Sequence, residues 1–238
     1  MLSFKSGKTP IAIIKGGKLN NELIFINNPN NKKEQIQEIE VHDGKIIVFP
    51  DPSRATRMYT GGPSGSGKST TEANWVRQYS KMNPDNKIFL FKRDDDFDPA
   101  YIGIDIEDRI SPKTDLNELS DSMLIFDDIA EIQDEVERVQ TNFLLKDALK
   151  NGRKKNISVA CSNHLLYDGN RTKDMLYQCD KLIIFPGSSN YMIENLCKKY
   201  VGMGKKAIDR LLSLPSRWVM ISKKYPQYVV YETGAYIL

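Results

Sequence analysis

The chain has 238 residues, of which 40% are hydrophobic and 27% are charged, as in ordinary globular proteins and unlike disordered chains. No apolar run approaches the roughly 18 residues that a membrane span needs, so we expect no membrane span. The N-terminus shows no secretory signal, and we expect none. Three cysteines without CxxC spacing, and only two histidines, predict reduced buried thiols rather than a zinc site.

The net charge of +3 conceals an uneven distribution along the chain. Residues 92–137 carry four basic and sixteen acidic side chains, a balance of −12 (4 − 16). Residues 198–238 carry eight basic and two acidic side chains, a balance of +6 (8 − 2). A basic segment can face a polyanion, although charge alone favours a solvated surface.

The order of the expected elements predicts an α/β protein. Residues 1–54 form a strand-rich N-terminal segment, and residues 55–238 alternate strands with helices, as in a mostly parallel sheet flanked by helices. Expected strands are 10–14, 22–26, 45–49, 57–60, 87–92, 123–126, 157–161 and 181–185, with a closing hairpin of 217–223 and 227–232. Expected helices are 69–81, 131–151, 173–178, 189–200 and 205–212.

The helix over 131–151 has the clearest signal in the chain. Its apolar residues follow helical spacing, and Gly152 lies where a C-terminal cap belongs. These apolar residues are Ile132, Val136, Val139, Phe143 and Leu144.

Residues 62–69 fit G-x-x-x-x-G-K-[ST] in full, between an expected strand and an expected helix. Backbone N–H groups of such a loop hold phosphate oxygens, and small residues let the main chain approach them closely. Lys68 would reach the β- and γ-phosphates of ATP, and the Ser69 hydroxyl would ligate Mg²⁺. The residues expected to bind the nucleotide are Gly62, Pro63, Ser64, Gly65, Ser66, Gly67, Lys68, Ser69 and Thr70.

An apolar strand that ends in acid is the second half of such a site, and residues 123–128, Met-Leu-Ile-Phe-Asp-Asp, supply it. Asp127 is expected to hold Mg²⁺ through water. Asp128 is the candidate that polarises an attacking water. Because aspartate is one methylene shorter than glutamate, Glu131 is a second candidate for this role.

A water that attacks a γ-phosphate also needs a polar sensor and a cation for the developing charge. The expected strand 157–161 leads into polar residues, and parallel strands present their C-terminal ends at a ligand crevice. Asn163 or His164 is therefore the candidate sensor. Arg153 precedes this strand and is the candidate cation, which would act on the nucleotide of a neighbouring subunit; a solvated turn is the alternative.

Four segments together resemble the genome-packaging ATPases of poxviruses, giant viruses and virophages, a branch of the FtsK–HerA superfamily of DNA-pumping motors. They are GGPSGSGKST at 61–70, MLIFDDI at 123–129, NGRKKNISVACSNH at 151–164 and KLIIFPG at 181–187. The resemblance covers residues 55–238 and implies a RecA-like fold. The chain departs from the pattern at the sensor, which is usually glutamine, at Lys154, which is often histidine, and at Asp128, which is commonly glutamate.

The resemblance implies Mg²⁺-dependent ATP hydrolysis that drives double-stranded DNA into a capsid. It implies a homo-oligomeric ring, a pentamer or a hexamer, a capsid or portal partner, and a place in the host-cell interior, in a virus factory or the cytoplasm, and in the virion. Lysines at 198–206 or at 154–155 would grip DNA phosphates without reading sequence. A nucleotide or small-molecule kinase, and an adaptor that binds ATP without turnover, are the alternative functions.

Overall fold

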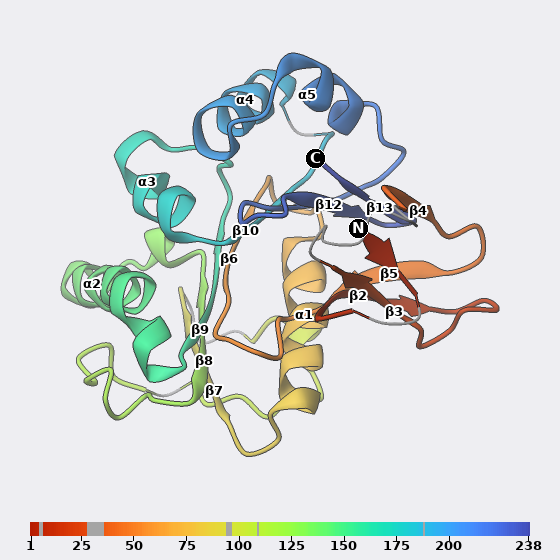
Figure 1. Ribbon diagram of the computed structural model, residues 1–238. Coiled ribbons are helices and arrows are strands. Elements are labelled where there is room, and N and C mark those ends of the chain that lie inside the picture. Colours follow the sequence, from red (N-terminus) through yellow and green to blue (C-terminus); the bar gives the residue numbers. More distant parts are fainter. Residues whose placement is uncertain (5–6, 28–35, 94–96, 109, 188) are drawn as a thin grey trace. The chain divides into compact units, whose positions relative to one another are not determined.

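The computed structural model describes residues 1–4, 7–27, 36–93, 97–108, 110–187 and 189–238 (Figure 1). The chain forms two compact units, residues 54–180 and residues 1–53 together with 181–238. The assignment of 1–54 and 55–238 as domains stays a prediction. No helix in the described part of the chain is both long enough and apolar enough to cross a membrane.

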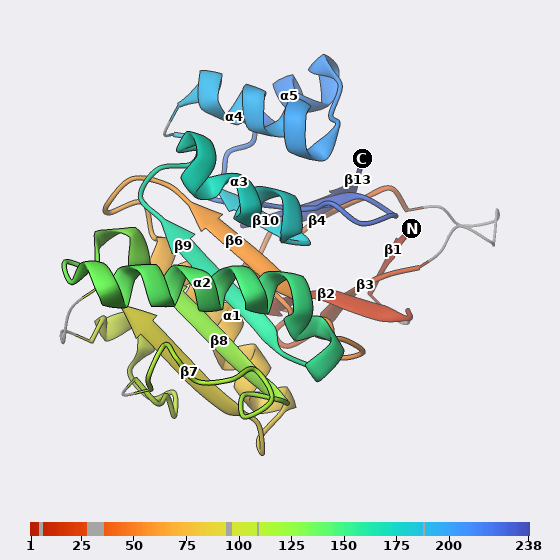
Figure 2. The same cartoon turned by 90° about the vertical axis from the view of Figure 1, so that its left-hand side faces the viewer.

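The unit 54–180 is built on four parallel strands in the order β7-β8-β9-β6. Helices α1 and α2 lie on opposite faces of this sheet (Figures 1 and 2). The strands are β6 Arg57–Gly61, β7 Lys87–Lys92, β8 Ser122–Asp127 and β9 Ser158–Asn163, and the helices are α1 Lys68–Met82, α2 Glu135–Asn151 and α3 Gly169–Gln178. Short 3-10 helices are η1 Pro99–Tyr101, η2 Ile129–Glu131 and η3 Gly152–Lys155.

Strand register brings the polar strand ends to one edge of this sheet. Gly61 at the end of β6 is paired with Asn163 at the end of β9, and Phe126 of β8 is paired with Cys161 of β9. The apolar interiors of β8 and β9 are fully buried, as expected of strands in a parallel sheet that is covered on both faces. The residue after each paired strand therefore emerges at the same edge as residues 62–69, the phosphate loop.

In its described residues, the unit that joins 1–53 and 181–238 contains antiparallel strands, two α-helices and a π-helix. One sheet has the order β1-β3-β2-β5, and the strands β4, β13, β12, β11 and β10 pair in that order. The strands are β1 Leu2–Ser3, β2 Thr9–Lys15, β3 Leu23–Ile26, β4 Glu38–Glu40, β5 Lys45–Val48, β10 Lys181–Ile184, β11 Val219–Ser222, β12 Tyr228–Tyr231 and β13 Gly234–Ile237. The helices are α4 Asn190–Leu196, the π-helix η4 Cys197–Val201 and α5 Lys205–Leu212.

The predicted α/β class, with a parallel sheet between helices and a strand-rich N-terminal segment, is confirmed. The expected hairpin also forms, because β11 and β12 are antiparallel neighbours. The helix expected at 189–200 is divided into α4 and η4. All three cysteines are free and buried, as predicted.

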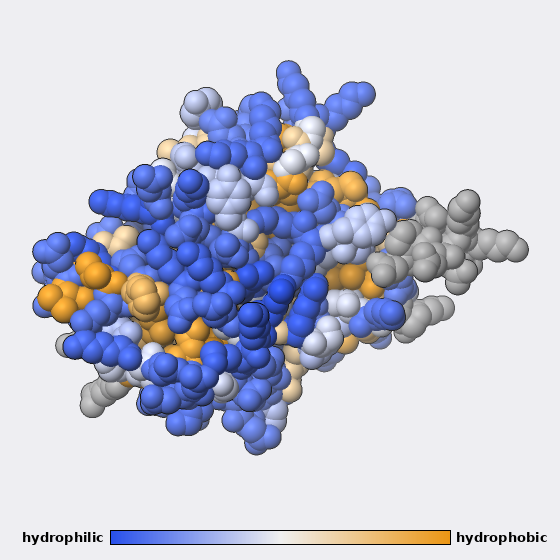
Figure 3. Space-filling view, turned by 60° about the vertical axis from the view of Figure 1, so that its left-hand side comes forward, coloured by the Kyte–Doolittle hydropathy of each residue, from blue (hydrophilic) through white to orange (hydrophobic). Residues whose placement is uncertain are grey.

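Helix α2 begins later than its apolar spacing predicts, and it buries a different face. It starts at Glu135 because the Asp134 side chain accepts a hydrogen bond from the Glu137 N–H at 2.8 Å, which is an N-cap. Three of the expected apolar residues are exposed: Val136 by 64%, Val139 by 61% and Phe143 by 74%. The buried face is formed instead by Thr141, Leu144, Leu145, Ala148 and Leu149. Figure 3 shows apolar patches on a face that is otherwise largely hydrophilic.

Candidate active site

The phosphate loop connects β6 to α1, so the positive N-terminal end of a 15-residue helix points at whatever the loop holds. Gly65 and Gly67 have φ angles of 74° and 102°, which L side chains rarely adopt. The loop is tied to the neighbouring strand, because the Gly62 N–H donates to the Asn163 carbonyl at 3.2 Å. This backbone leaves open space at Gly65, where an added Cβ would meet nothing within 4 Å.

Lys68, His164 and Asp128 form a continuous chain of polar contacts. The Lys68 ammonium lies 3.1 Å from His164 Nδ1, and His164 Nε2 lies 3.0 Å from Asp128 Oδ2. Because an ammonium only donates, Nδ1 must accept, which leaves the proton of a neutral imidazole on Nε2 to face the carboxylate. Lys68 itself is buried and also donates to the Pro63 carbonyl at 3.4 Å.

Ser162 holds the two acidic residues in place. Its hydroxyl donates to Asp127 Oδ1 and accepts from the Asp128 N–H at 3.3 Å. Asp128 occupies the left-handed region at φ 45°, which aspartate tolerates better than most residues and which turns its side chain away from the direction of β8. Burial and then the charge of Asp127 raise the pKa of Asp128, while Lys68 and His164 oppose this shift.

A buried carboxyl lies behind the phosphate loop. Glu72 of α1 is 0% exposed, and its Oε1 accepts a hydrogen bond from the Tyr101 hydroxyl at 2.7 Å. Burial and then the charge of Asp127 raise the pKa of Glu72 to about 8, and the Tyr101 hydrogen bond opposes this shift. The pKa of Tyr101 is raised as well, chiefly by burial.

The residues present fit a metal-bound triphosphate. Ser66 Oγ and Asp128 Oδ1 are buried, and neither has a hydrogen-bond partner among the described residues. Buried polar atoms without partners are unfavourable, so these two atoms indicate a polar ligand. Within the described residues no three histidine, cysteine or acidic side chains gather to hold a metal by themselves. Ser69 and Asp127 would therefore share Mg²⁺ with the phosphates and water.

The candidate sensor and the candidate cation do not all lie at the phosphate loop. Asn163 Oδ1 accepts from the Leu165 N–H at 3.0 Å, so this side chain supports the turn after β9, whereas His164 contacts both Lys68 and Asp128. Arg153 is exposed in η3, before β9 begins. The length of β9 thus separates it from the phosphate loop of its own chain, roughly 20 Å at about 3.3 Å per residue.

Ser162 and Glu72 are site residues that the sequence did not predict. Ser162 lies within the polar end of the expected strand, but only the parallel register shows that it is beside Asp127. Glu72 is four residues after Lys68, one helical turn along α1, and this spacing could have indicated that it shares a face with the phosphate loop.

The comparisons with solved structures show the fold. The genome-packaging NTPase B204 of Sulfolobus turreted icosahedral virus 2, in complex with ATP-gammaS, matches with a TM-score of 0.51 and 13% identity over 76% of this chain and 98% of B204. The cytoplasmic domain of the type VII secretion ATPase EccC of Thermomonospora curvata matches with a TM-score of 0.55 and 12% identity over 87% of this chain and 31% of EccC. The conjugation coupling protein TcpA of pCW3 matches with a TM-score of 0.51 and 12% identity over 95% of this chain and 77% of TcpA.

Fold and site together define a P-loop NTPase, and the resemblance to viral genome-packaging ATPases is confirmed at the level of the fold. No family model matches the chain. Uncharacterized protein V3 of Sputnik virophage is 34% identical over 244 residues, which cover 99% of both chains. The chain belongs to the same family as this virophage protein.

Proposed function

We propose that this protein is an ATPase that drives double-stranded DNA into a viral capsid. The observation that carries the proposal is the chain of polar contacts from Lys68 through His164 to Asp128, which joins a phosphate-binding cation to a half-buried carboxylate. The similarity of the fold to the packaging NTPase B204 supports the choice of DNA packaging.

Hydrolysis at this site is an in-line attack of water on the γ-phosphorus. The bond between the γ-phosphorus and the bridging oxygen breaks, ADP leaves, and the proton of the attacking water passes to Asp128. Ser69 and Asp127 would hold Mg²⁺, which would supply positive charge to the phosphate oxygens. Lys68 exchanges its contacts with Pro63 and His164 for the β- and γ-phosphates.

His164 is the sensor in this proposal, and Asn163 supports the strand end. With ATP bound, the γ-phosphate takes the place of His164 at the Lys68 ammonium, and His164 then reports the state of the phosphate to Asp128. Ser162 keeps Asp127 and Asp128 in fixed relative positions during this exchange.

Arg153 supports a ring-shaped assembly in which one subunit completes the site of the next. It is an exposed cation away from its own phosphate loop, so it suits action on a neighbouring nucleotide. We propose a pentameric or hexameric ring around DNA, docked on a capsid or portal protein. Its work belongs to the host-cell interior, in a virus factory or the cytoplasm, where capsids are filled, and the protein would accompany them into the virion.

Single substitutions with ATPase measurements test this proposal. Lys68→Ala and Asp128→Asn are each expected to lower DNA-stimulated hydrolysis by about 10²–10⁴-fold, because they remove the phosphate-binding cation and the general base. Lys81→Ala, at an exposed position in the last turn of the same helix, is the matched control and should keep full activity.

Three results would contradict the proposal. Hydrolysis that ignores DNA argues against a DNA motor. Phosphate transfer to a small acceptor instead of water identifies a kinase. Tight ATP binding without turnover identifies an adaptor.

A further inference from the structure

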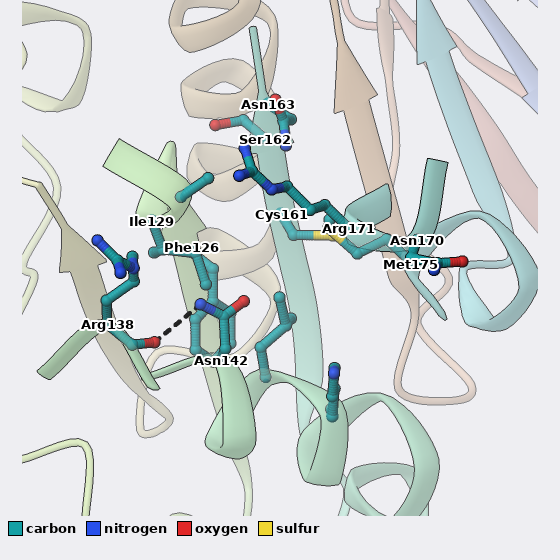
Figure 4. A pocket seen from close by; sticks show the side chains of 13 residues that line it. Phe126, Ile129, Arg138, Asn142, Cys161, Ser162, Asn163, Asn170, Arg171 and Met175 are labelled. Atoms are coloured by element: carbon teal, nitrogen blue, oxygen red, sulfur yellow. Dashed lines mark hydrogen bonds between the residues drawn. The ribbon is translucent and has the colours of Figure 1, made fainter. Parts of the chain in front are cut away.

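A cavity of about 420 Å³ is lined by residues of α2 and α3 (Figure 4). These two helices lie on the face of the sheet opposite α1 (Figure 1). Its floor is apolar and includes Phe126, Leu145, Cys161 and Met175. Its size falls within the range of small-ligand sites, and it has a polar wall above the apolar floor. Nothing in the proposed hydrolysis step uses it.

The wall of the cavity is cationic. Arg138 and Lys146 reach it from α2, and Arg171 reaches it from the first turn of α3. Among the described residues that line it there is no aspartate or glutamate, and Asn142 and Asn170 add amide groups. The positive N-terminal end of α3 adds to the favourable potential for an anion.

The three cations have only loose acidic partners outside the cavity lining. Arg138 lies 4.0 Å from Glu135, Lys146 lies 3.9 Å from Asp174 and Arg171 lies 3.4 Å from Asp168. Exposed pairs at such distances are weak, so an anion in the cavity would not have to displace strong salt bridges. Planar guanidinium groups beside amide donors match the acceptor oxygens of a phosphate group.

The cavity meets the candidate active site at the end of β9. Ser162 and Asn163 line it, and the same Ser162 hydroxyl contacts Asp127 and the Asp128 N–H. Figure 4 shows the Arg171 side chain extending across β9 toward Ser162 and Asn163. A ligand in the cavity would therefore act directly on the serine that positions the acidic pair.

We propose that this cavity binds a phosphate group. The group comes either from the orthophosphate that hydrolysis releases, which rests on the proposed function, or from the backbone of nucleic acid. In both cases the ligand is held by Arg138, Lys146 and Arg171 and is sensed by the active site through Ser162.

Binding of inorganic phosphate and of a short DNA duplex to the full chain tests the proposal. Both titrations use Lys68→Ala as the background, so that the phosphate loop does not contribute an anion site of its own. The double variant K146A/R171A removes two cations of the cavity. The matched control K150A/K173A removes two exposed cations from the same two helices, and neither of these lines the cavity.

Saturable binding of inorganic phosphate that is at least about tenfold weaker in K146A/R171A, but unchanged in K150A/K173A, supports the product as ligand. If only the duplex binds, a salt slope that is reduced by about two in K146A/R171A and unchanged in the control supports nucleic acid. Equal behaviour of the two double variants toward both ligands overturns the proposal. If the wild-type protein does not hydrolyse ATP but the cavity still binds phosphate or the duplex, the proposed function is refuted and the cavity remains a phosphate site.

Discussion

Glu72 is a carboxyl group that the fold keeps away from water beside other acids. The Tyr101 hydroxyl satisfies one of its oxygens, and Oε2 has no partner among the described residues. With a pKa of about 8 in the folded state against 4.5 for an ordinary glutamate, it stays protonated at neutral pH. Because neutral Glu72 adds no negative charge beside Asp127, the Asp127 carboxylate is the charged group there that can attract a cation.

Glu72→Gln should change how stability depends on pH. The folded pKa is raised, so from pH 4.5 to about 8 the unfolded chain releases a proton that the folded chain retains, and the wild type loses stability over this window. The variant lacks this loss. Urea unfolding from pH 4 to 9 should show the variant gaining stability relative to the wild type up to about pH 8, with a constant difference above it.

Tyr101→Phe is the companion variant for this measurement. The Tyr101 hydrogen bond lowers the pKa of Glu72, so its removal should raise this pKa. The pH range over which the protein loses stability should then extend to higher pH. Wild-type and Glu72→Gln curves that run parallel over the whole range would show that Glu72 titrates normally.

At the scale of single residues, the sequence predicted those whose chemistry is tied to a local motif. Lys68 and Asp127 follow from short patterns whose spacing is set by one loop and one strand. Ser162 and Glu72 could not be chosen in this way, because serines and glutamates are common and their roles depend on the neighbours that register and helical phase supply.

Among the helices, α2 carries two apolar stripes of different width. The narrow stripe is exposed, and the wider stripe, spaced i, i+3, i+4, i+7 and i+8 from Thr141, is buried. The neighbouring residues Phe143 and Leu144 belong to different stripes and are 74% and 4% exposed. They offer a direct comparison within one turn.

Leu144→Ala should lower the free energy of unfolding by about 2–5 kcal/mol, because it leaves a cavity against the sheet. Phe143→Ala should change it by no more than about 0.5 kcal/mol, because it removes contacts with solvent only. Urea denaturation with matched m-values measures both. A loss at Phe143 as large as that at Leu144 would mean that the exposed stripe is packed.

The strands of the parallel sheet were predicted to within two residues, whereas the short strands β1, β4 and β13 were not predicted. A short, continuous apolar run such as 123–126 is typical of a strand that is buried on both faces of a parallel sheet. The start of α2 was placed too early because the apolar spacing continues through Ile132, whereas the Asp134 cap decides the boundary. The buried face of α2 could not be predicted from the sequence, because both stripes have helical periodicity.

For the molecule as a whole, the excess of positive charge lies in residues 198–238. Lys205 and Lys206, in the first turn of α5, are exposed, while Lys198 has an acidic partner, Glu194, at 3.3 Å. Lys154 and Lys155 of η3 are the alternative patch, and Lys155 is hydrogen-bonded to Asn117. Lysines with acidic or amide partners are less available to phosphates.

K205A/K206A should therefore weaken binding of a DNA duplex and reduce the slope of log K against log salt by about two. K154A/K155A removes the same charge and should have a smaller effect. Fluorescence anisotropy at several salt concentrations measures both slopes. A larger change in K154A/K155A would transfer the DNA contact to η3.

The grouping of residues 1–53 with 181–238 had no signal in the sequence. It depends on pairing between β4 and β13, with Glu40 opposite Gly234, which joins the two ends of the chain. Such long-range pairs are set by the whole fold rather than by local propensity. The alternation of strands and helices predicted the parallel unit because parallel neighbouring strands need a crossover connection, usually a helix, between them.

The burial of Cys161, Cys179 and Cys197 has a practical consequence for following this protein at work. Burial raises the pKa of Cys197 to about 12 and raises that of Cys161 well above its ordinary value, so neither thiol forms the reactive thiolate readily. A cysteine introduced at an exposed position would be the preferred target of a fluorescent maleimide. Site-specific dyes could then be attached without removing any native sulfur from the interior.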